Sequence, residues 1–184
     1  MNTKHQTSIL SNLFQNKTQA IVAELLFLFL AGIFGAVIQY YIKMPMHLPG
    51  KQGLLFMLIL VSCATVSNFK GAALFTTSGA AFFFLVFQMG AQDIFKPFIF
   101  LISGATLDFL IFFWRKMNKP LIFLALAGGI AWTVIPFIRI FISLFSGFVY
   151  KSFASGIVYP LFTHFVFGSV AALIAGIALK KFYK

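Results

Sequence analysis

The sequence predicts an all-α polytopic membrane protein with six transmembrane helices and both termini in the cytoplasm. Three observations predict this fold. Hydrophobic residues make up 61% of the chain and charged residues only 9%, with a mean hydropathy of +0.99, whereas about 25% of the residues of a soluble domain are charged. The apolar residues form six successive runs with short connectors. Lysine and arginine stand mainly at the ends of these runs.

The length of 184 residues and the short connectors leave no room for a folded soluble part. We predict a polar cytoplasmic leader over residues 1–18 and one six-helix transmembrane domain over residues 19–184. The leader lacks the apolar core and small-residue cleavage site of a signal peptide. The single Cys63 excludes an internal disulfide.

The six helices are placed by runs of mostly apolar residues, of which a span needs about 20. The second run is short, so we expect it to be little tilted, extended toward Lys51, or partly covered by other helices rather than lipid. The connector before it, "MPMHLPGKQG", holds two prolines and two glycines, which predict a shaped turn. The predicted spans are 20–42, 53–67, 71–89, 97–114, 121–145 and 153–179.

The distribution of positive charge predicts the orientation. Cytoplasmic loops of membrane proteins carry an excess of lysine and arginine. With both termini inside, the inner side holds Lys4, Lys17, Lys70, Arg115, Lys116, Lys119, Lys180, Lys181 and Lys184. The outer side holds only Lys43, Lys51, Lys96 and Lys151. The connector "MPMHLPGKQG" therefore faces outward.

Small residues recur four apart on two of the predicted spans, which lets helix backbones approach closely in lipid. These stripes predict either packing within the six-helix bundle or docking of another membrane protein. They consist of Ala31, Gly32, Gly35 and Ala36 in the first span and Gly168, Ala172 and Gly176 in the last.

Three ionisable residues fall within predicted spans, where a charge costs at least about 2.5 kcal/mol at the helix centre. Asp108 lies about 10 Å from the inner end of its span and Arg139 about 27 Å from the inner end of its own. We therefore expect no direct pair between them and a structural role for Asp108. Glu24 is expected to make a surface or partner contact. Arg139 either reaches the outer interface or binds an anion in an outward-facing pocket.

The predicted outer half gathers side chains that could bind a ligand. Some of the 27 phenylalanines could also line a wide apolar pocket there. The candidate residues are Tyr40, Tyr41, Met44, Met46, His47, Lys51, Lys96, Arg139, Tyr159 and His164.

The sequence contains no enzymatic constellation. It has no Walker loop, no His-x-x-x-His pair and only three acidic residues, so ATP hydrolysis within this chain is excluded. Lysines at the ends of apolar runs indicate topology and lipid head-group contact, and argue against nucleic acid as a partner.

With "AGIFGA" in the first span, the loop "HLPG" and "PFIFLISGATLDFL" in the fourth, the chain resembles the S-components of energy-coupling factor (ECF) importers. The resemblance implies a protein of the bacterial cytoplasmic membrane that captures a vitamin, metal or cofactor outside and topples in the bilayer. It also implies partners, a transmembrane coupling subunit (T-component) and two cytoplasmic ATPases. The docking face would be Ala31, Gly32, Gly35 and Ala36.

For the ligand, the outer residues favour haem, which needs an apolar cavity, an axial ligand and cations for its propionates. His47 is the leading candidate for the iron, with Tyr40, Tyr41, Met44 or Met46 as alternatives. Arg139, Lys51 and Lys96 could hold the propionates. In this combination the chain is similar to the haem-specific S-component of staphylococcal-type bacteria.

Two alternatives remain. One is an S-component for biotin, pantothenate or a thiamine pyrimidine, with Arg139 or Lys96 on a carboxylate. Thiamine-type ligands fit less well, because Trp132 is predicted no nearer the outer face than mid-membrane. The other is a membrane assembly protein without a solute.

Overall fold

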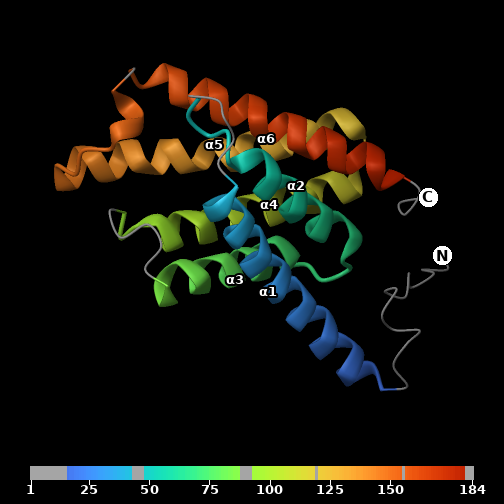
Figure 1. Cartoon of the computed structure of the whole chain (residues 1–184). Coiled ribbons are helices and arrows are strands. Elements are labelled where there is room, and N and C mark those ends of the chain that lie inside the picture. Colours follow the sequence, from blue (N-terminus) through green and yellow to red (C-terminus); the bar gives the residue numbers. More distant parts are fainter. Residues whose placement is uncertain (1–15, 43–47, 88–92, 119, 155, 181–184) are drawn as a thin grey trace.

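The computed structural model describes residues 16–42, 48–87, 93–118, 120–154 and 156–180. Within these ranges the chain forms six α-helices and a short 3₁₀ helix, η2, at Lys151–Phe153, and no strand (Figure 1). The all-α prediction is therefore confirmed. The helices are α1 (Lys17–Tyr41), α2 (Gly53–Val66), α3 (Ala72–Val86), α4 (Lys96–Lys116), α5 (Leu121–Ser146) and α6 (Val158–Ala178).

Four of the six helices, α1, α4, α5 and α6, are long and apolar enough to cross a membrane. The chain is thus a multi-pass membrane protein. With 14 and 15 residues, α2 and α3 extend only about 21–23 Å at 1.5 Å per residue, less than the bilayer core of about 30 Å. Of the six predicted spans, four are therefore helices that could cross a membrane by length and composition.

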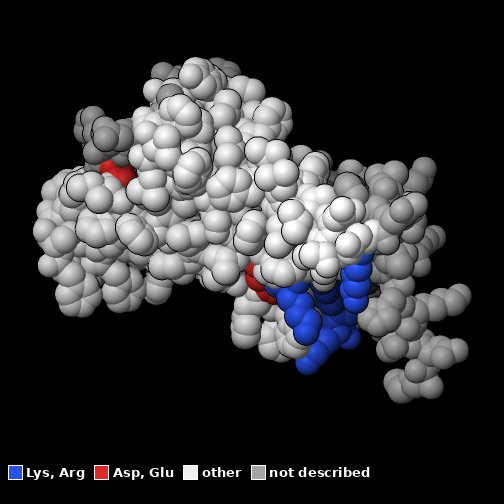
Figure 2. Space-filling view, turned by 90° about the horizontal axis from the view of Figure 1, so that it is seen from below, with Lys and Arg blue, Asp and Glu red and all other residues white. Residues whose placement is uncertain are grey.

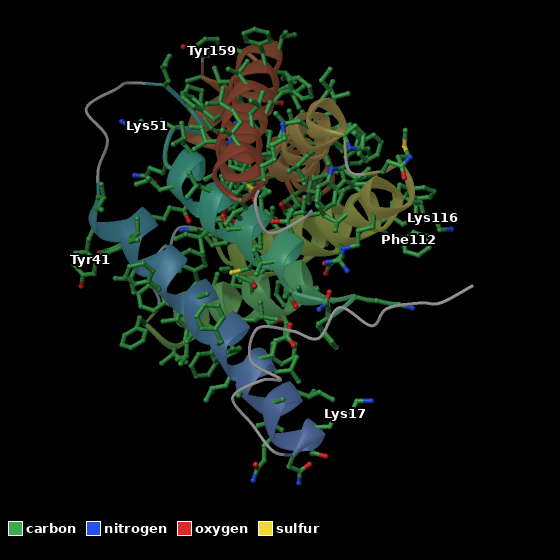
Figure 3. All side chains as sticks on the ribbon, turned by 90° about the vertical axis from the view of Figure 1, so that its right-hand side faces the viewer. Lys17, Tyr41, Lys51, Phe112, Lys116 and Tyr159 are labelled. Atoms are coloured by element: carbon green, nitrogen blue, oxygen red, sulfur yellow. The ribbon has the colours of Figure 1, made fainter. Side chains whose placement is uncertain are left out.

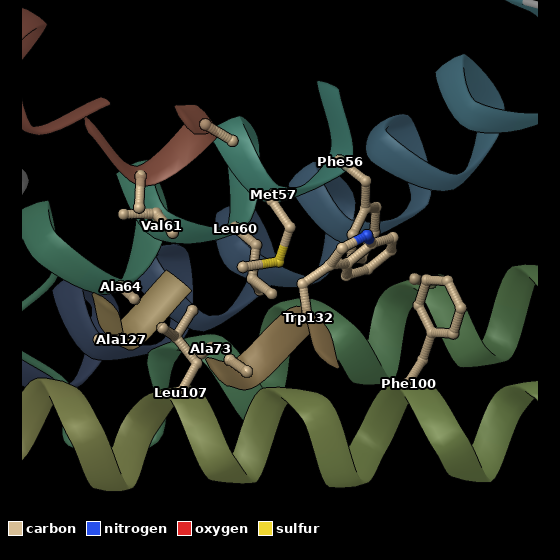
Figure 4. Packing of buried hydrophobic residues seen from close by; sticks show 14 of the residues in the cluster. Phe56, Met57, Leu60, Val61, Ala64, Ala73, Phe100, Leu107, Ala127 and Trp132 are labelled. Carbon is tan, nitrogen blue, oxygen red and sulfur yellow. The ribbon is translucent and has the colours of Figure 1, made fainter. Parts of the chain in front are cut away.

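Helix α2 is the centre of the bundle and contacts all five other helices. Its residues Phe56, Met57, Leu60, Val61 and Ala64 are at most 1% exposed. They pack against side chains of α3, α4 and α5 in the core (Figure 4). Protein rather than lipid therefore covers most of this short helix. This agrees with the expectation that other helices partly cover it.

The small residues of α1 pack inside the bundle. A Cβ added to Gly32 would lie 1.7 Å from the Thr76 carbonyl oxygen of α3, and one on Gly35 would lie 3.0 Å from the Phe56 ring of α2. Ala36 is fully buried and Ala31 half-buried. In this arrangement the stripe joins α1 to α2 and α3, and most of its surface is covered by the chain itself.

The stripe of α6 is used in the same way against α5. A Cβ on Gly168 would lie 2.5 Å from the Gly128 carbonyl oxygen, and one on Gly128 would lie 2.4 Å from Ala172 Cβ. Gly176 meets Leu121. Both small-residue stripes thus bring helix backbones within the bundle close together.

Figure 2 shows lysine and arginine gathered at one end of the molecule, on its right, which corresponds to the right-hand end of Figure 1. This basic end is where α1, α3 and α5 begin and α2, α4 and α6 end. The opposite end, where α1 ends and α4 and α6 begin, holds the cavity described below and is called the cavity end.

Asp108 of α4 caps α3 at the basic end. Its Oδ1 accepts from the Ala73 N–H at 2.9 Å and its Oδ2 from the Leu74 N–H at 2.7 Å. The N-cap residue Gly71 offers no side chain to these amides. The structural role expected for Asp108 is confirmed, and so is the absence of a pair with Arg139, which instead pairs with Asp93.

The side chains of Arg115 and Glu24 also find hydrogen-bond partners at this end. Arg115 donates to the carbonyl oxygens of Ala64 at 2.8 Å and Ser67 at 2.6 Å, which close the C-terminal end of α2. Glu24 accepts from the Ser67 hydroxyl at 2.6 Å. The charged groups of the basic end therefore hold α1, α2 and α4 together.

Candidate functional site

A cavity of about 330 Å³ opens at the cavity end of the bundle. Its walls come from the end of α1, the loop before α2, the start of α4, the middle of α5 and the first half of α6. The lining residues are Gln39, Leu48, Pro49, Gly50, Lys51, Gln52, Gly53, Lys96, Phe100, Trp132, Ile135, Arg139 and His164.

Aromatic rings form one side of this cavity. The Trp132 indole stacks on the His164 ring at 5.9 Å and 25°, and it meets the Phe56 and Phe100 rings at 6.0 and 5.9 Å. Figure 4 shows Phe56, Trp132 and Phe100 grouped together. These side chains are 1–4% exposed, so the rings give the cavity a rigid, flat surface.

The loop 48–52 and the first residue of α2 rest directly on these rings through two glycines, Gly50 and Gly53. A Cβ on Gly50 would lie 2.7 Å from His164 Nδ1, and one on Gly53 would lie 2.0 Å from the Trp132 indole. Gly50 also has φ +80, a conformation that residues with a side chain rarely adopt. The stretch "PGKQG" is therefore built to lie flat against the aromatic rings.

The hydrogen bond of His164 fixes its tautomer. Nδ1 lies 2.7 Å from the Pro160 carbonyl oxygen, which only accepts, so Nδ1 carries the proton. In the neutral ring Nε2 then has the free lone pair, which is the arrangement found at metal-ligating histidines.

Of the three cations that line the cavity, Arg139 and Lys96 differ in their partners. Arg139 forms an ion pair with Asp93 at 2.8 Å, the one salt bridge found among the described residues. Lys96 therefore has no carboxylate partner in that part of the chain. Its Nζ lies 3.7 Å above the Phe84 ring and 6.0 Å from the Phe100 ring.

Asp93 is also held by Tyr150, which follows α5. The Tyr150 hydroxyl donates to Asp93 Oδ1 at 3.2 Å, and its ring lies 5.2 Å from the Arg139 guanidinium carbon. Burial, together with the neighbouring Asp93 charge, raises the pKa of Tyr150 to about 12. Tyr150 thus remains a hydrogen-bond donor at neutral pH.

Several buried polar atoms of the cavity residues have no hydrogen-bond partner. Within the described ranges these are Gln39 Oε1, Trp132 Nε1 and Arg139 Nε, with Ser169 Oγ as a fourth atom elsewhere. Such atoms are rare in folded proteins. Two of the three are pure donors, so a ligand with acceptor oxygens matches them.

The structure places the predicted site residues in three groups. Lys51, Lys96, Arg139 and His164 line the cavity. Tyr40, Tyr41 and Tyr159 do not line it and are 44%, 66% and 38% exposed; Figure 3 shows Tyr41 and Tyr159 pointing away from the bundle, with Lys51 on the loop between them. His47, Met46 and Met44 lie outside the described residues.

Sequence reasoning missed three participants. Asp93, the partner of Arg139, could have been found because it is the one acidic residue of the chain on the predicted outer side. Trp132 was placed no nearer the outer face than mid-membrane, yet it lines the cavity. Gln39 had no distinguishing signal.

The charged residues in the cavity wall are thus Lys51, Lys96 and Arg139, the last paired with Asp93, beside the rings of Trp132 and His164. Comparison with known protein families, with curated proteins and with solved structures finds no match to this chain.

Proposed function

We propose that this protein captures a small organic molecule with a carboxylate group from outside the bacterial cytoplasmic membrane, as the substrate-binding S-component of an ECF-type importer. The observation that carries the proposal is Lys96, a cation in the cavity wall without a carboxylate partner among the described residues. An unpaired charge in a partly buried site is costly, and a ligand carboxylate removes that cost.

The rest of the cavity suits such a ligand. Arg139 Nε and Trp132 Nε1 offer donors to acceptor oxygens, and the flat faces of Trp132 and Phe100 can pack against an uncharged body. The volume of about 330 Å³ stands at the lower end of ligand pockets, which span about 300–1,000 Å³. Biotin and pantothenate, each with one carboxylate, belong to the class of molecule favoured here.

Haem is the second candidate. It is favoured by His164, whose Nε2 is available as an axial ligand once Nδ1 donates to Pro160. Lys96 and Arg139 would pair with propionates. The small volume stands against haem, and so does the presence of only one phenylalanine, Phe100, among the described residues of the cavity wall, because a porphyrin needs a wide apolar surface.

The proposed orientation places the cavity end outside and the basic end in the cytoplasm, in line with the positive-inside rule. Energy would come from partners, a transmembrane coupling subunit and two ATPases, because the chain has no ATP-binding motif. We assign no docking role to Gly32, Gly35 and Ala36, since they are buried between α1, α2 and α3.

The test is calorimetric titration of the purified protein with biotin and pantothenate, each beside its uncharged analogue, biotinamide and pantothenol. We expect one acid to bind far more tightly than its analogue. Lys96→Met should weaken that binding roughly 10- to 150-fold, the equivalent of about 1.5–3 kcal/mol for a hydrogen bond to a charged group.

Lys116→Met is the matched control, because Lys116 lies beside Phe112 at the basic end (Figure 3). Its Nζ is 4.3 Å from the centre of the Phe112 ring. Equal binding of acid and analogue would refute the carboxylate proposal. A Soret shift on addition of hemin that is lost in His164→Ala would favour haem instead. If none of these compounds binds, the alternative of a membrane assembly protein without a solute is favoured over an importer subunit.

A further inference from the structure

We infer that the cavity recognises an uncharged N–H or O–H donor of its ligand through Nε2 of His164. The inference rests on the proposed function, because it names a second feature of the carboxylic acid that Lys96 is proposed to bind. It assigns His164 as a specificity-determining residue. The substrate class then narrows to carboxylic acids that also carry an uncharged hydrogen-bond donor.

The first step is that the His164 ring is held in one orientation. Its Nδ1 donates to the Pro160 carbonyl oxygen at 2.7 Å, one turn back in α6. The ring stacks on the Trp132 indole at 5.9 Å and 25°. A Cβ on Gly50 would lie 2.7 Å from Nδ1 and 2.9 Å from Cε1, so the loop before α2 also packs against the ring. The direction in which Nε2 points is therefore fixed.

The second step is the state of Nε2. Because Nδ1 carries the proton, Nε2 of the neutral ring has a lone pair and can only accept a hydrogen bond. In the part of the chain that the structure describes, the hydrogen bond of the ring is the one from Nδ1. Nε2 is also not among the buried unpartnered atoms of that part, and His164 lines the cavity. The lone pair is therefore open to a ligand.

The third step is the kind of group that this acceptor suits. Lys51, Lys96 and Arg139 line the same cavity, and their positive charges disfavour a further charge on the imidazole. A neutral lone pair binds an uncharged N–H or O–H, whereas a carboxylate oxygen offers it no proton. The carboxylate at Lys96 and the donor at His164 are therefore different parts of one ligand molecule.

This chemistry defines which acids fit the site. Biotin carries ureido N–H groups and pantothenate carries an amide N–H and hydroxyl groups, so both have a donor for His164. A carboxylic acid without any such donor, such as lipoate, lacks it. His164 therefore separates acids that have the same carboxylate and a similar chain.

The experiment compares three probes that share one flexible chain, namely 5-acetamidopentanoate, 5-acetoxypentanoate and 5-acetamidopentanamide. Each is titrated by calorimetry into the full-length protein at neutral pH. The acetoxy acid keeps the carboxylate and the carbonyl group and has an ester oxygen in place of the amide N–H. Wild-type protein should bind the acetamido acid about 2- to 12-fold more tightly than the acetoxy acid, the range of a net hydrogen bond between uncharged groups.

The variants assign this preference to one atom. His164→Phe keeps an aromatic ring beside Trp132 and removes Nε2, so the two acids should bind equally. His164→Gln supplies an acceptor oxygen again and should restore part of the preference. Thr163→Val is the matched control, because the Thr163 hydroxyl donates to the same Pro160 carbonyl oxygen at 3.1 Å and Thr163 is not among the described residues of the cavity wall. It should keep the preference.

The two proposals fail separately. Wild-type protein that prefers 5-acetamidopentanoate to 5-acetamidopentanamide but binds the two acids equally refutes the role of His164 and leaves the carboxylate proposal intact. A His164→Phe protein that keeps the preference for the acetamido acid has the same meaning. Equal binding of 5-acetamidopentanoate and 5-acetamidopentanamide refutes the carboxylate proposal. Absence of binding by all three probes overturns both.

Discussion

The cap that Asp108 supplies to α3 can be tested by removing it. α3 begins after Gly71, which has no side chain to satisfy the first amides of the helix. Asp108, which lies on α4, supplies this cap to α3. Its carboxylate oxygens accept hydrogen bonds of 2.9 and 2.7 Å from the Ala73 and Leu74 amides. Asp108→Ala leaves both amides without a side-chain acceptor.

The magnitude follows from the two bonds. Loss of an N-cap side chain costs about 0.5–2 kcal/mol, typically about 1, and here two charge-assisted bonds are lost, so we expect about 2–3 kcal/mol. For a chain of this size 1 kcal/mol corresponds to about 2–4 °C in Tm. The melting temperature of the Asp108→Ala protein should therefore fall by about 4–12 °C. Asp108→Asn, which keeps one acceptor oxygen, should lose about half as much.

The assay is thermal unfolding of the purified protein in detergent, followed by circular dichroism. Thr106→Ala is the control, since the Thr106 hydroxyl bonds only to Ile102 O one turn back in its own helix, and we expect less than 2 °C of change. Equal Tm values for wild-type and Asp108→Ala protein would refute the capping argument. So would a fall as large for Asp108→Asn as for Asp108→Ala.

Three further outcomes are expected. Gly32→Ala should lower Tm in the same assay, because the added Cβ would lie 1.7 Å from the Thr76 carbonyl oxygen. Such overpacking costs about 1–3 kcal/mol of stability. An unchanged Tm would contradict the close contact of α1 and α3. Arg115→Met should lower Tm by several degrees through loss of its bonds to Ala64 O and Ser67 O, and Lys116→Met should not. Tyr150, with its pKa raised from 10.0 to about 12, binds its proton more tightly when folded, so stability should fall as pH rises from 10 toward 12. The loss of stability between pH 10 and 12 should be smaller in Tyr150→Phe. An equal pH dependence of stability in the two proteins would contradict the raised pKa of Tyr150.

Much of the fold could be predicted from the sequence because lipid imposes long apolar runs. The six runs correspond to six helices, and the bounds of α5 are within one residue of those expected. The shortness of α3 could not be foreseen, because the apolar run continues past Val86 and hydropathy does not distinguish helix from apolar loop. Whether a small-residue stripe packs inward or outward also depends on helix arrangement, which the spacing of Gly32 and Gly35 does not specify.

The candidate site was predictable only in part. Polar residues in apolar surroundings were a valid signal, which is how Lys51, Lys96, Arg139 and His164 were found. The pairing of Arg139 with Asp93 joins residues 46 apart, and such distant contacts leave no local pattern. The tyrosines at the end of α1 were included because of their position along the chain, yet a helix end has several faces, and theirs points away from the cavity.

The shortness of α2 has a consequence for the cavity wall. The helix begins at Gly53, in the cavity wall, and its 14 residues fall about 9 Å short of the bilayer core, or about six residues of helix. Loop 48–52, which precedes that start, supplies five of the lining residues, among them Lys51. The point at which this buried helix begins therefore leaves a polar loop, instead of more helix, in the cavity wall.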